Sequence, residues 1–312
     1  MLLDTAALYF RAFFGVPDSV RAPNGMPVNA VRGLLDIIAR LGSEFQPTEM
    51  VACWDDDWRP QWRVDLIPTY KAHRVAVASS AVGSTAVEEV PDLLTPQVPI
   101  IRDVLGALEI PVVGAPSHEA DDVIGTLASH SAIPVDVVTG DRDLFQVIDD
   151  SREVRVIYTG RGMSRLEILT DTALKDKYGV AASHYADFAV LRGDPSDGLP
   201  GVVGVGEKTA ASLLASYGSL DRIIAAAADP GSEMAAPMRV KITAAADYLQ
   251  VAPTVVQVVR NLQLPEFDAR IRSSTAEQLT ELERLSAAWG LGSALQRARD
   301  VLDACATPNP GG

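Results

Sequence analysis

The chain has little cysteine: only Cys53 and Cys305 occur among its 312 residues, and their spacing matches no metal-binding or redox motif. Two such residues argue against a disulfide framework. The sequence also lacks any apolar run of the roughly 18 residues that a membrane helix requires, and its start lacks the basic-then-apolar pattern of a signal peptide. These absences predict a cytoplasmic protein with no membrane partner.

Basic residues are scarce as well, with 27 Lys and Arg against 41 Asp and Glu, which gives a net charge of −14. Because phosphate contacts need Lys and Arg, this balance argues against indiscriminate coating of nucleic acid. It leaves open the recognition of a particular nucleic-acid shape, since bound cations would offset a local group of acids. The hydrophobic content of 47% is enough for a real core and excludes disorder for most of the chain.

What the chain does have is a set of acids placed where a metal site would need them. They follow expected strands, open a helix or lie in a glycine-rich loop, and the carboxyl ends of strands in an open parallel sheet converge on one crevice. Unpaired acids there would repel one another, and divalent cations are the simplest remedy. The candidate ligands are Asp4, Asp55, Glu119, Asp121, Asp122, Asp141, Asp143, Asp194 and Asp197.

Any one of these acids is more often a turn former or a helix cap, and their joint placement is what favours a metal site. Glu119 and Asp122 are three residues apart and share a helix face, while Gly140 allows Asp141 and Asp143 to aim at one centre. Oxygen ligands without His or Cys suit magnesium or manganese rather than zinc. Two such ions about 4 Å apart serve phosphodiester cleavage. The spacing does not fix which acid binds which ion.

The pattern of apolar segments predicts an α/β fold with a mainly parallel sheet flanked by helices over the first 160 residues. Ser117 is the expected N-cap of the helix that carries Glu119 and Asp122. The expected strands are a first one ending at Asp4 and then 50–54, 110–113, 135–138 and 154–158. The expected helices are one directly after the first strand, 29–41 and 96–108.

From about residue 168 the chain is expected to be mostly helical. Residues 255–259 read as a strand returning to the sheet, and 74–91, with small residues and no clear period, predict a functional lid or a mobile segment. Residues 305–312 are expected to be disordered. The expected helices are 170–178, 183–191, 207–217, 219–228, 233–249 and 275–304.

Two elements are suited to nucleic acid. Lys71 and Arg74 would face one way on a helix, and Tyr70 beside them offers a flat face on which a base could stack. The alternative for this stretch is an ordinary solvated basic face.

The second element is a glycine-rich loop before a helix, which would bind phosphate through backbone N–H groups. A nucleotide-binding loop is its rival, but no strand precedes these glycines and no GxxxxGK[ST] is present. Its expected DNA-binding residues are Gly201, Gly204, Gly206, Lys208 and Thr209.

Together these residues resemble the bacterial 5′-nuclease superfamily, which includes the 5′→3′ exonuclease domain of family A DNA polymerases and stand-alone flap endonucleases. The likeness runs from Asp4 to about Leu220 and continues more weakly to about Leu264. The segments that carry it, in order, are Leu2-Leu3-Asp4, Tyr70-Lys71-Ala72-His73-Arg74, Glu119-Ala120-Asp121-Asp122, Thr139-Gly140-Asp141-Arg142-Asp143-Leu144, and Gly193-Asp194-Pro195-Ser196-Asp197 through Lys208-Thr209-Ala210.

The resemblance implies a PIN-like nuclease core over 1–165, a helical arch over about 62–98, and a helix-three-turn-helix DNA-binding domain over 166–304. Such enzymes hold two divalent metals and cleave DNA near a junction of duplex and single strand. The expected substrates are therefore DNA with 5′ ends, flaps or such junctions, in replication or repair. A monomer at the bacterial nucleoid is expected, and because the chain stops at 312, a stand-alone protein.

By position, the resemblance divides the acids between two metals. Asp4, Asp55, Glu119 and Asp121 are similar to first-metal ligands or their outer shell, Asp122, Asp141 and Asp143 are similar to shared ligands, and Asp194 and Asp197 to the second site. Lys71 and Arg74 are similar to arch residues on the scissile phosphate, and with Asp141 they form the expected catalytic group. Lys208 and the 201–206 loop would hold the duplex, and family hairpins often bind a potassium ion there.

The chain also departs from the family pattern. Thr5 and Gly198 replace a usual glycine and a usual asparagine, and Asp55 is followed by two further acids, but no ligand is lost. The start lies close to the first ligand, so the true N-terminal start stays open. Two other functions stay open too: a non-catalytic, structure-specific DNA-binding module and a PIN-type ribonuclease.

Overall fold

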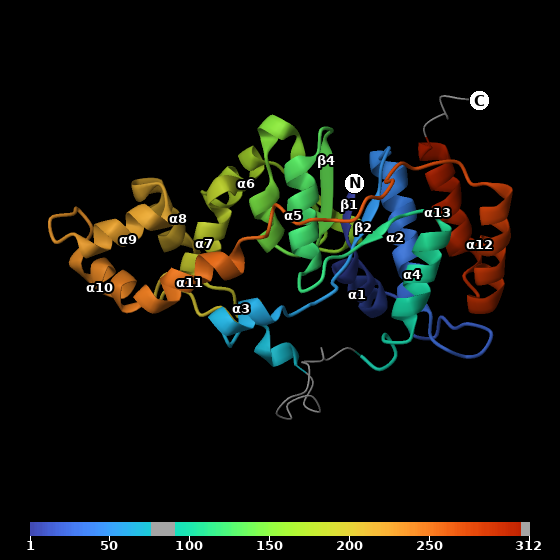
Figure 1. Cartoon of the computed structure of the whole chain (residues 1–312), viewed down its shortest axis with the longest axis horizontal. Coiled ribbons are helices and arrows are strands. Elements are labelled where there is room, and N and C mark those ends of the chain that lie inside the picture. The colour runs from blue at the N-terminus through green and yellow to red at the C-terminus, as the bar shows by residue number, and fades with distance from the viewer. Residues whose placement is uncertain (76–90, 307–312) are drawn as a thin grey trace.

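A computed structural model describes residues 1–75 and 91–306 of the chain. Its centre is a six-stranded sheet with strand order β3-β2-β1-β4-β5-β6 (Figure 1). The first five strands along the chain are parallel to their neighbours, and β6 pairs antiparallel with β5. The expectation of a mainly parallel sheet is therefore confirmed. The strands are β1 (Leu2–Asp4), β2 (Val51–Cys53), β3 (Val112–Val113), β4 (Val135–Thr139), β5 (Val154–Tyr158) and β6 (Glu167–Leu169).

The central strands of the sheet are buried on both faces because most of their residues are apolar. Successive side chains of a strand point to opposite faces. Leu2 and Val137 accordingly belong to one buried cluster, while Leu3 and Val138 belong to the other. Runs of this kind are typical of parallel strands that helices cover on both sides.

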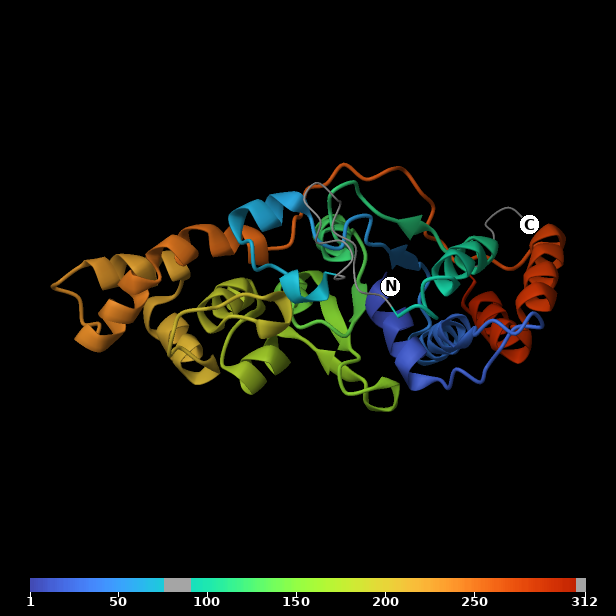
Figure 2. The ribbon, with the colours of Figure 1, turned by 90° about the horizontal axis from the view of Figure 1, so that it is seen from below.

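Helices cover both faces of the sheet. The face of Leu3 packs against α1 (Thr5–Gly15), α2 (Asn29–Phe45), α4 (Gln97–Ala107), α12 (Ala276–Trp289) and α13 (Gly292–Cys305). The face of Leu2 packs against α5 (Ala120–His130), α6 (Asp171–Tyr178) and α7 (Tyr185–Arg192). A second group of helices lies at one end of the molecule, on the left in Figure 1 and in Figure 2, and consists of α8 (Glu207–Tyr217), α9 (Leu220–Ala228), α10 (Ala236–Ala244) and α11 (Ala246–Val256).

Several expected elements take a different form. The expected helix 233–249 is two helices, and the expected helix 275–304 divides at Gly290, which has a left-handed φ of 63°. Residues 255–259 are not a strand: Val255 and Val256 end α11, and the backbone N–H of Val258 donates to a side chain, Gln146, rather than to a sheet neighbour. Their β-branched, apolar character reflects burial rather than strand pairing.

Helix α5 also begins later than expected. Glu119, not Ser117, is its N-cap, and Ser117 has a left-handed φ of 59°. The side chains of Glu119 and Asp122 accept from each other's backbone N–H groups in a capping box. This box fixes the start of α5 two residues beyond the expected cap.

The expected domain boundary at residue 165 falls inside the sheet, because β6 follows it and pairs with β5. In addition, α12 and α13 from the expected second domain pack against α2 and α4 of the first (Figure 1). The central part of the expected arch, 76–90, and most of the expected tail, 307–312, lie outside the described residues. Among the residues described, no helix combines the length and the apolarity needed to cross a membrane.

Candidate metal centre and nucleic-acid interface

The acids predicted from strand ends do meet at one edge of the sheet. Asp4 ends β1, Asp55 follows β2, Asp141 follows β4, and the N-cap of α5 brings Glu119 and Asp121 to the same place. A depression of about 290 Å³ is lined by all five of them together with Lys71, Arg74 and Arg11. The parallel sheet thus converts four distant stretches of sequence into one acidic site.

Hydrogen bonds hold two of these carboxylates in place. Asp4 accepts from the Thr139 hydroxyl at 2.6 Å and from the backbone of α1. Asp55 accepts from the Ala120 N–H at 2.7 Å, which joins β2 to the first turn of α5. Each of these carboxylates keeps oxygen lone pairs free for a further partner.

A second group of acids lies beside the first. Asp121, Asp143 and Asp197 line a small adjoining cavity. Asp194 caps the 3-10 turn η7 (Pro195–Asp197) and is held by Arg192 at 3.2 Å. Oδ1 of Asp143 is buried and has no hydrogen-bond partner among the described residues, so a partner is missing at this point.

Burial makes these carboxylates reluctant to ionise. It raises the pKa of Asp4 to about 7, aided by the charges of Asp55 and Asp141 and opposed by the Thr139 hydrogen bond. Burial likewise raises the pKa of Asp197 to about 6. The same cause raises the pKa of Asp55, Asp121 and Asp143. Ionised acids gathered in this way need a counter-charge.

The donor set fits hard divalent cations, because it consists of carboxylates and includes the orphaned oxygen of Asp143. As the side chains stand, however, no three acidic, histidine or cysteine residues of the described ranges enclose an ion site. Basic side chains hold several of the acids instead.

Asp122 differs from the other candidate ligands. It is fully buried, and Arg63 binds it with two hydrogen bonds of 2.9 and 2.7 Å. Its Oδ1 also accepts from the Val259 N–H at 2.9 Å. Its two oxygens are thus committed to α3 (Gln61–Leu66) and to the segment after α11, which is a structural role. The structure does not bring Asp122 into the depression.

Lys71 and Tyr70 both point inward onto Glu119. The Lys71 ammonium forms a buried ion pair with Oε2 of Glu119, and the Tyr70 hydroxyl donates to Oε1 at 2.7 Å. Tyr70 is only 4% exposed, so its ring face is not available for base stacking, contrary to expectation. Lys71 also has a left-handed φ of 47° and precedes the short 3-10 turn η1 (Ala72–Arg74), so Lys71 and Arg74 do not share a regular helix.

The segment around Lys71 is docked on the loop that carries Asp197. Arg74 binds Oδ1 of Asp197 at 2.9 Å, and the Lys71 N–H donates to the Asp197 carbonyl. Thr69 approaches Gly198 so closely that a Cβ on Gly198 would lie 2.1 Å from the Thr69 carbonyl oxygen. Gly198 therefore allows a contact that any side chain at this position would obstruct.

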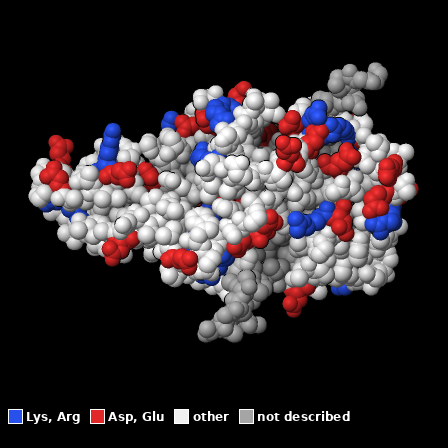
Figure 3. Space-filling model, viewed as in Figure 1, with Lys and Arg blue, Asp and Glu red and all other residues white. Residues whose placement is uncertain are grey.

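The glycine-rich loop leads directly into α8, as the sequence predicted. Gly201 and Gly204 have positive φ values of 65° and 76°, and Gly206 is the N-cap of α8 without a side-chain cap. Lys208 is exposed in the first turn and Thr209 is half-buried. The first turn of α8 thus keeps N–H groups for an anion. On the face shown in Figure 3, acidic and basic side chains are interspersed rather than gathered into one basic surface.

Two arginines that the sequence did not predict as site residues also lie here. Arg63 holds Asp122 and also approaches Glu119 at 3.2 Å. Arg11 lines the acidic depression, and its Nε is buried without a hydrogen-bond partner among the described residues. Arg11 lies seven residues after Asp4, two helical turns into α1, and this spacing was a usable signal.

Known protein families match nearly all of this chain. Residues 1–179 match the model of the 5′-3′ exonuclease N-terminal resolvase-like domain, and residues 180–278 match the 5′-3′ exonuclease C-terminal SAM fold. The chain belongs to the 5′-3′ exonuclease family. The boundary between the two matched domains, at residues 179/180, assigns β6 and α6 to the domain that contains the sheet. In the structure, β6 likewise pairs with β5, and α6 packs on the face of Leu2.

Relatives of similar length carry the same name. The 5′-3′ exonuclease of Streptomyces coelicolor is 56% identical over 97% of this chain and 100% of its own length. The 5′-3′ exonuclease of Mycobacterium tuberculosis is 49% identical over 97% of both chains. DNA polymerase I of Mycobacterium bovis is 42% identical over 72% of this chain but only 24% of the polymerase.

Solved structures share the fold at low sequence identity. The T5 D15 protein co-crystallized with metal ions has a TM-score of 0.63 at 15% identity and covers 98% of both chains. Human GEN1 in complex with Holliday junction DNA has a TM-score of 0.60 at 18% identity, over 96% of this chain and 70% of GEN1. Both likenesses are likenesses of fold.

Proposed function

We propose that this member of the 5′-3′ exonuclease family is a metal-dependent 5′→3′ exonuclease and structure-specific flap endonuclease that hydrolyses DNA phosphodiesters in replication or repair. One observation carries the proposal: buried acids from separate strand ends line a single depression together with Lys71 and Arg74. The relatives of similar length, both 5′-3′ exonucleases, support the activity.

Two divalent cations, magnesium or manganese, are the proposed cofactors. Neighbours of the same fold include a T5 D15 protein crystallized with metal ions, which supports a metal requirement. Asp122 is withdrawn from direct ligation because Arg63 and the Val259 N–H occupy it. The proposed ligands are Asp4, Asp55, Glu119, Asp121, Asp141, Asp143, Asp194 and Asp197. When bound, such ions supply an activated water and offset the charge of the leaving oxygen.

The chain's own residues would bind and orient the DNA. Lys71 and Arg74 would hold the scissile phosphate and stabilise the charge that develops on it. Arg11, whose Nε has no hydrogen-bond partner among the described residues and which lines the same depression, is a third group for that phosphate. The first turn of α8, with Lys208, would hold the duplex backbone without reading sequence. DNA with 5′ ends, flaps or single-strand/duplex junctions is the proposed substrate.

The test uses a DNA duplex with a labelled 5′ flap, incubated with the protein and magnesium or manganese. We expect cuts near the flap junction that EDTA abolishes. Asp141→Ala should lose cleavage and keep most of its DNA affinity, because Asp141 lines the acidic depression rather than the glycine-rich loop before α8. A thermal unfolding curve for the variant controls for folding. Binding without cutting by the intact protein, in both metals, would contradict the enzyme and favour a DNA-binding module.

A matched RNA flap distinguishes a PIN-type ribonuclease, which would cut the RNA in preference. A cytoplasmic monomer at the bacterial nucleoid completes the proposal, because chromosomal DNA is the substrate. A potassium ion at 201–206 belongs to it as well, although Lys241 already donates to the Gly204 carbonyl at 3.1 Å. Light scattering of the free protein tests the monomer.

A further inference from the structure

Two arginines from distant parts of the chain meet at one carboxylate oxygen. Arg142 stands between Asp141 and Asp143 after β4, and Arg192 ends α7. The Nη1 atoms of both lie 3.4 Å from the same Oε1 of Glu207, the first residue of α8. This cluster therefore lies between the acidic depression and the glycine-rich loop.

The cluster has more hydrogen-bond donors than acceptors. A guanidinium carries five N–H donors, and the only partner of Arg142 among the described residues is this one distant oxygen. Arg192 donates to the Gly193 carbonyl at 3.0 Å and to Asp194 at 3.2 Å, and its third contact is the Glu207 carboxylate. An excess of donors of this kind suits an anion.

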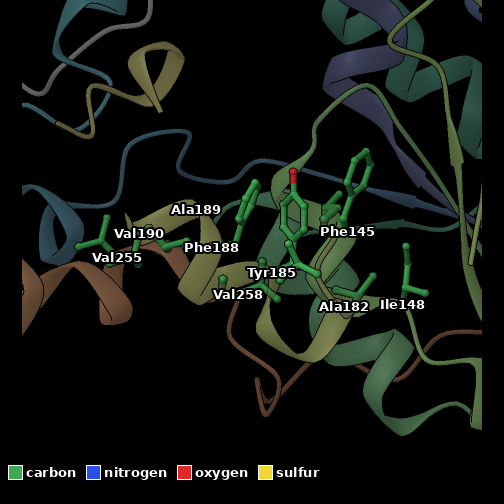
Figure 4. Packing of buried hydrophobic residues seen from close by; sticks show 14 of the residues in the cluster. Phe145, Ile148, Ala182, Tyr185, Phe188, Ala189, Val190, Val255 and Val258 are labelled. Atoms are coloured by element: carbon green, nitrogen blue, oxygen red, sulfur yellow. The ribbon is translucent and has the colours of Figure 1, made fainter. Parts of the chain in front are cut away.

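Tyr185 adds a further unused polar group. Its hydroxyl is buried without a partner among the described residues, and the charges of Arg192 and Arg142 act on it. In Figure 4 its ring stands between those of Phe188 and Phe145, and the hydroxyl is at the tip that points away from Val258. The aromatic packing thus fixes the ring and directs the oxygen out of the apolar cluster.

We propose that Arg142 and Arg192 form a subsite for a DNA backbone phosphate between the acidic depression and the glycine-rich loop before α8, and that the Glu207 carboxylate occupies this subsite until DNA displaces it. The inference rests on the proposed function. Glu207 is 52% exposed, so its side chain can turn into solvent at little cost. A phosphate can accept paired hydrogen bonds from an arginine, which makes it the better partner.

A purely structural ion pair predicts a different result, and the sign of one substitution separates the two. Glu207→Gln should strengthen DNA binding severalfold if Glu207 fills a phosphate subsite. Arg142→Met and Arg192→Met should each weaken binding about tenfold and reduce the slope of log affinity against log salt by about one. A structural pair would leave affinity unchanged and lower only the melting temperature.

The experiment measures binding of a fluorescent 5′-flap duplex by anisotropy at several salt concentrations, once in EDTA and once in calcium. A loss of DNA affinity in both EDTA and calcium would be due to the phosphate contact rather than to ions bound near Asp194. Arg155→Met is the matched control, because Arg155 also pairs with a single acid and is similarly exposed, 41% against 36% for Arg142, but lies at the opposite edge of the sheet. Glu233→Gln controls for the loss of an acidic side chain elsewhere in the helical group α8 to α11.

The inference fails if Arg142→Met and Arg192→Met bind as Arg155→Met does, or if Glu207→Gln gains no more affinity than Glu233→Gln. In either case an intact protein that still binds and cuts the flap leaves the proposed function standing. If the intact protein binds no flap DNA in either condition, both proposals fall together.

Discussion

The ammonium of Lys71 is bound to the carboxylate of Glu119, so a group proposed to hold phosphate is held by a group proposed to hold metal. Burial alone would lower the pKa of Lys71, but Glu119 and its neighbours outweigh it and raise this pKa well above the usual value. Lys71 is therefore a charged competitor for the metal site. Arg74 stands in the same relation to Asp197.

The first prediction follows from this competition: Lys71→Met should bind divalent cations more tightly than the native protein, by about tenfold, because Glu119 loses the ammonium on Oε2 and keeps only Arg63 on Oε1. Isothermal titration with manganese measures the affinity. Arg11→Met is the control, since it removes a positive charge from the same depression without touching an acid. Equal gains in the two variants would mean general electrostatics and not competition.

The second prediction concerns pH and the ion-free protein. The folded-state pKa of Asp4 is about 7 and that of Asp197 about 6, both above the ordinary value near 3.8, so the folded state binds more protons in this interval. The free energy of unfolding must then fall as pH rises from about 4 to 7. Urea denaturation in EDTA at pH 5 and pH 8 should show a loss of at least 1 kcal/mol, on the order of one pKa unit. Added magnesium should reverse most of it at pH 8, and a flat profile would contradict the burial of these acids.

The third prediction concerns the buried pair of Arg63 and Asp122. Arg63→Met should lower the free energy of unfolding by about 3–5 kcal/mol, because it leaves a carboxylate buried without its partner. Arg297→Met, at an exposed pair with Asp36, should cost no more than about 1 kcal/mol. Urea denaturation compares the two variants. Similar losses in both would show that water reaches Asp122.

The fourth prediction concerns the close contact at Gly198. Gly198→Ala should separate Thr69 from the Asp197 loop, because the new Cβ would overlap the Thr69 carbonyl at 2.1 Å. Lys71 and Arg74 would shift with it, so single-turnover cleavage of a flap should slow at least tenfold while affinity for the DNA changes less. Gly15→Ala is the control, at a glycine with no neighbour within 4 Å. Unchanged cleavage would show that the docking of this segment does not position Lys71 and Arg74.

The sequence was informative where one local rule determines the structure. Acids after apolar runs ended up at one sheet edge, because parallel strands must all end there. It was misleading where distant partners decide: Tyr70 turned inward to Glu119, Asp122 was taken by Arg63, and Val255 and Val256 completed a helix. The first two of these outcomes depend on residues more than 45 positions away, and the carbonyl of Val255 accepts from Arg63, which is farther still. Local pattern contains no information about such partners.

The packing of α13 against α2 and of α12 against α4 also constrains how the protein is made. Helices α2 and α4 are complete by residue 107, yet the helices that pack against them begin at residue 276. During synthesis, which proceeds from the N-terminus, the nuclease core must wait with an uncovered surface until the last segment has left the ribosome. Shortened versions that stop near residue 275 would keep every proposed ligand and every proposed DNA contact, yet we expect them to aggregate.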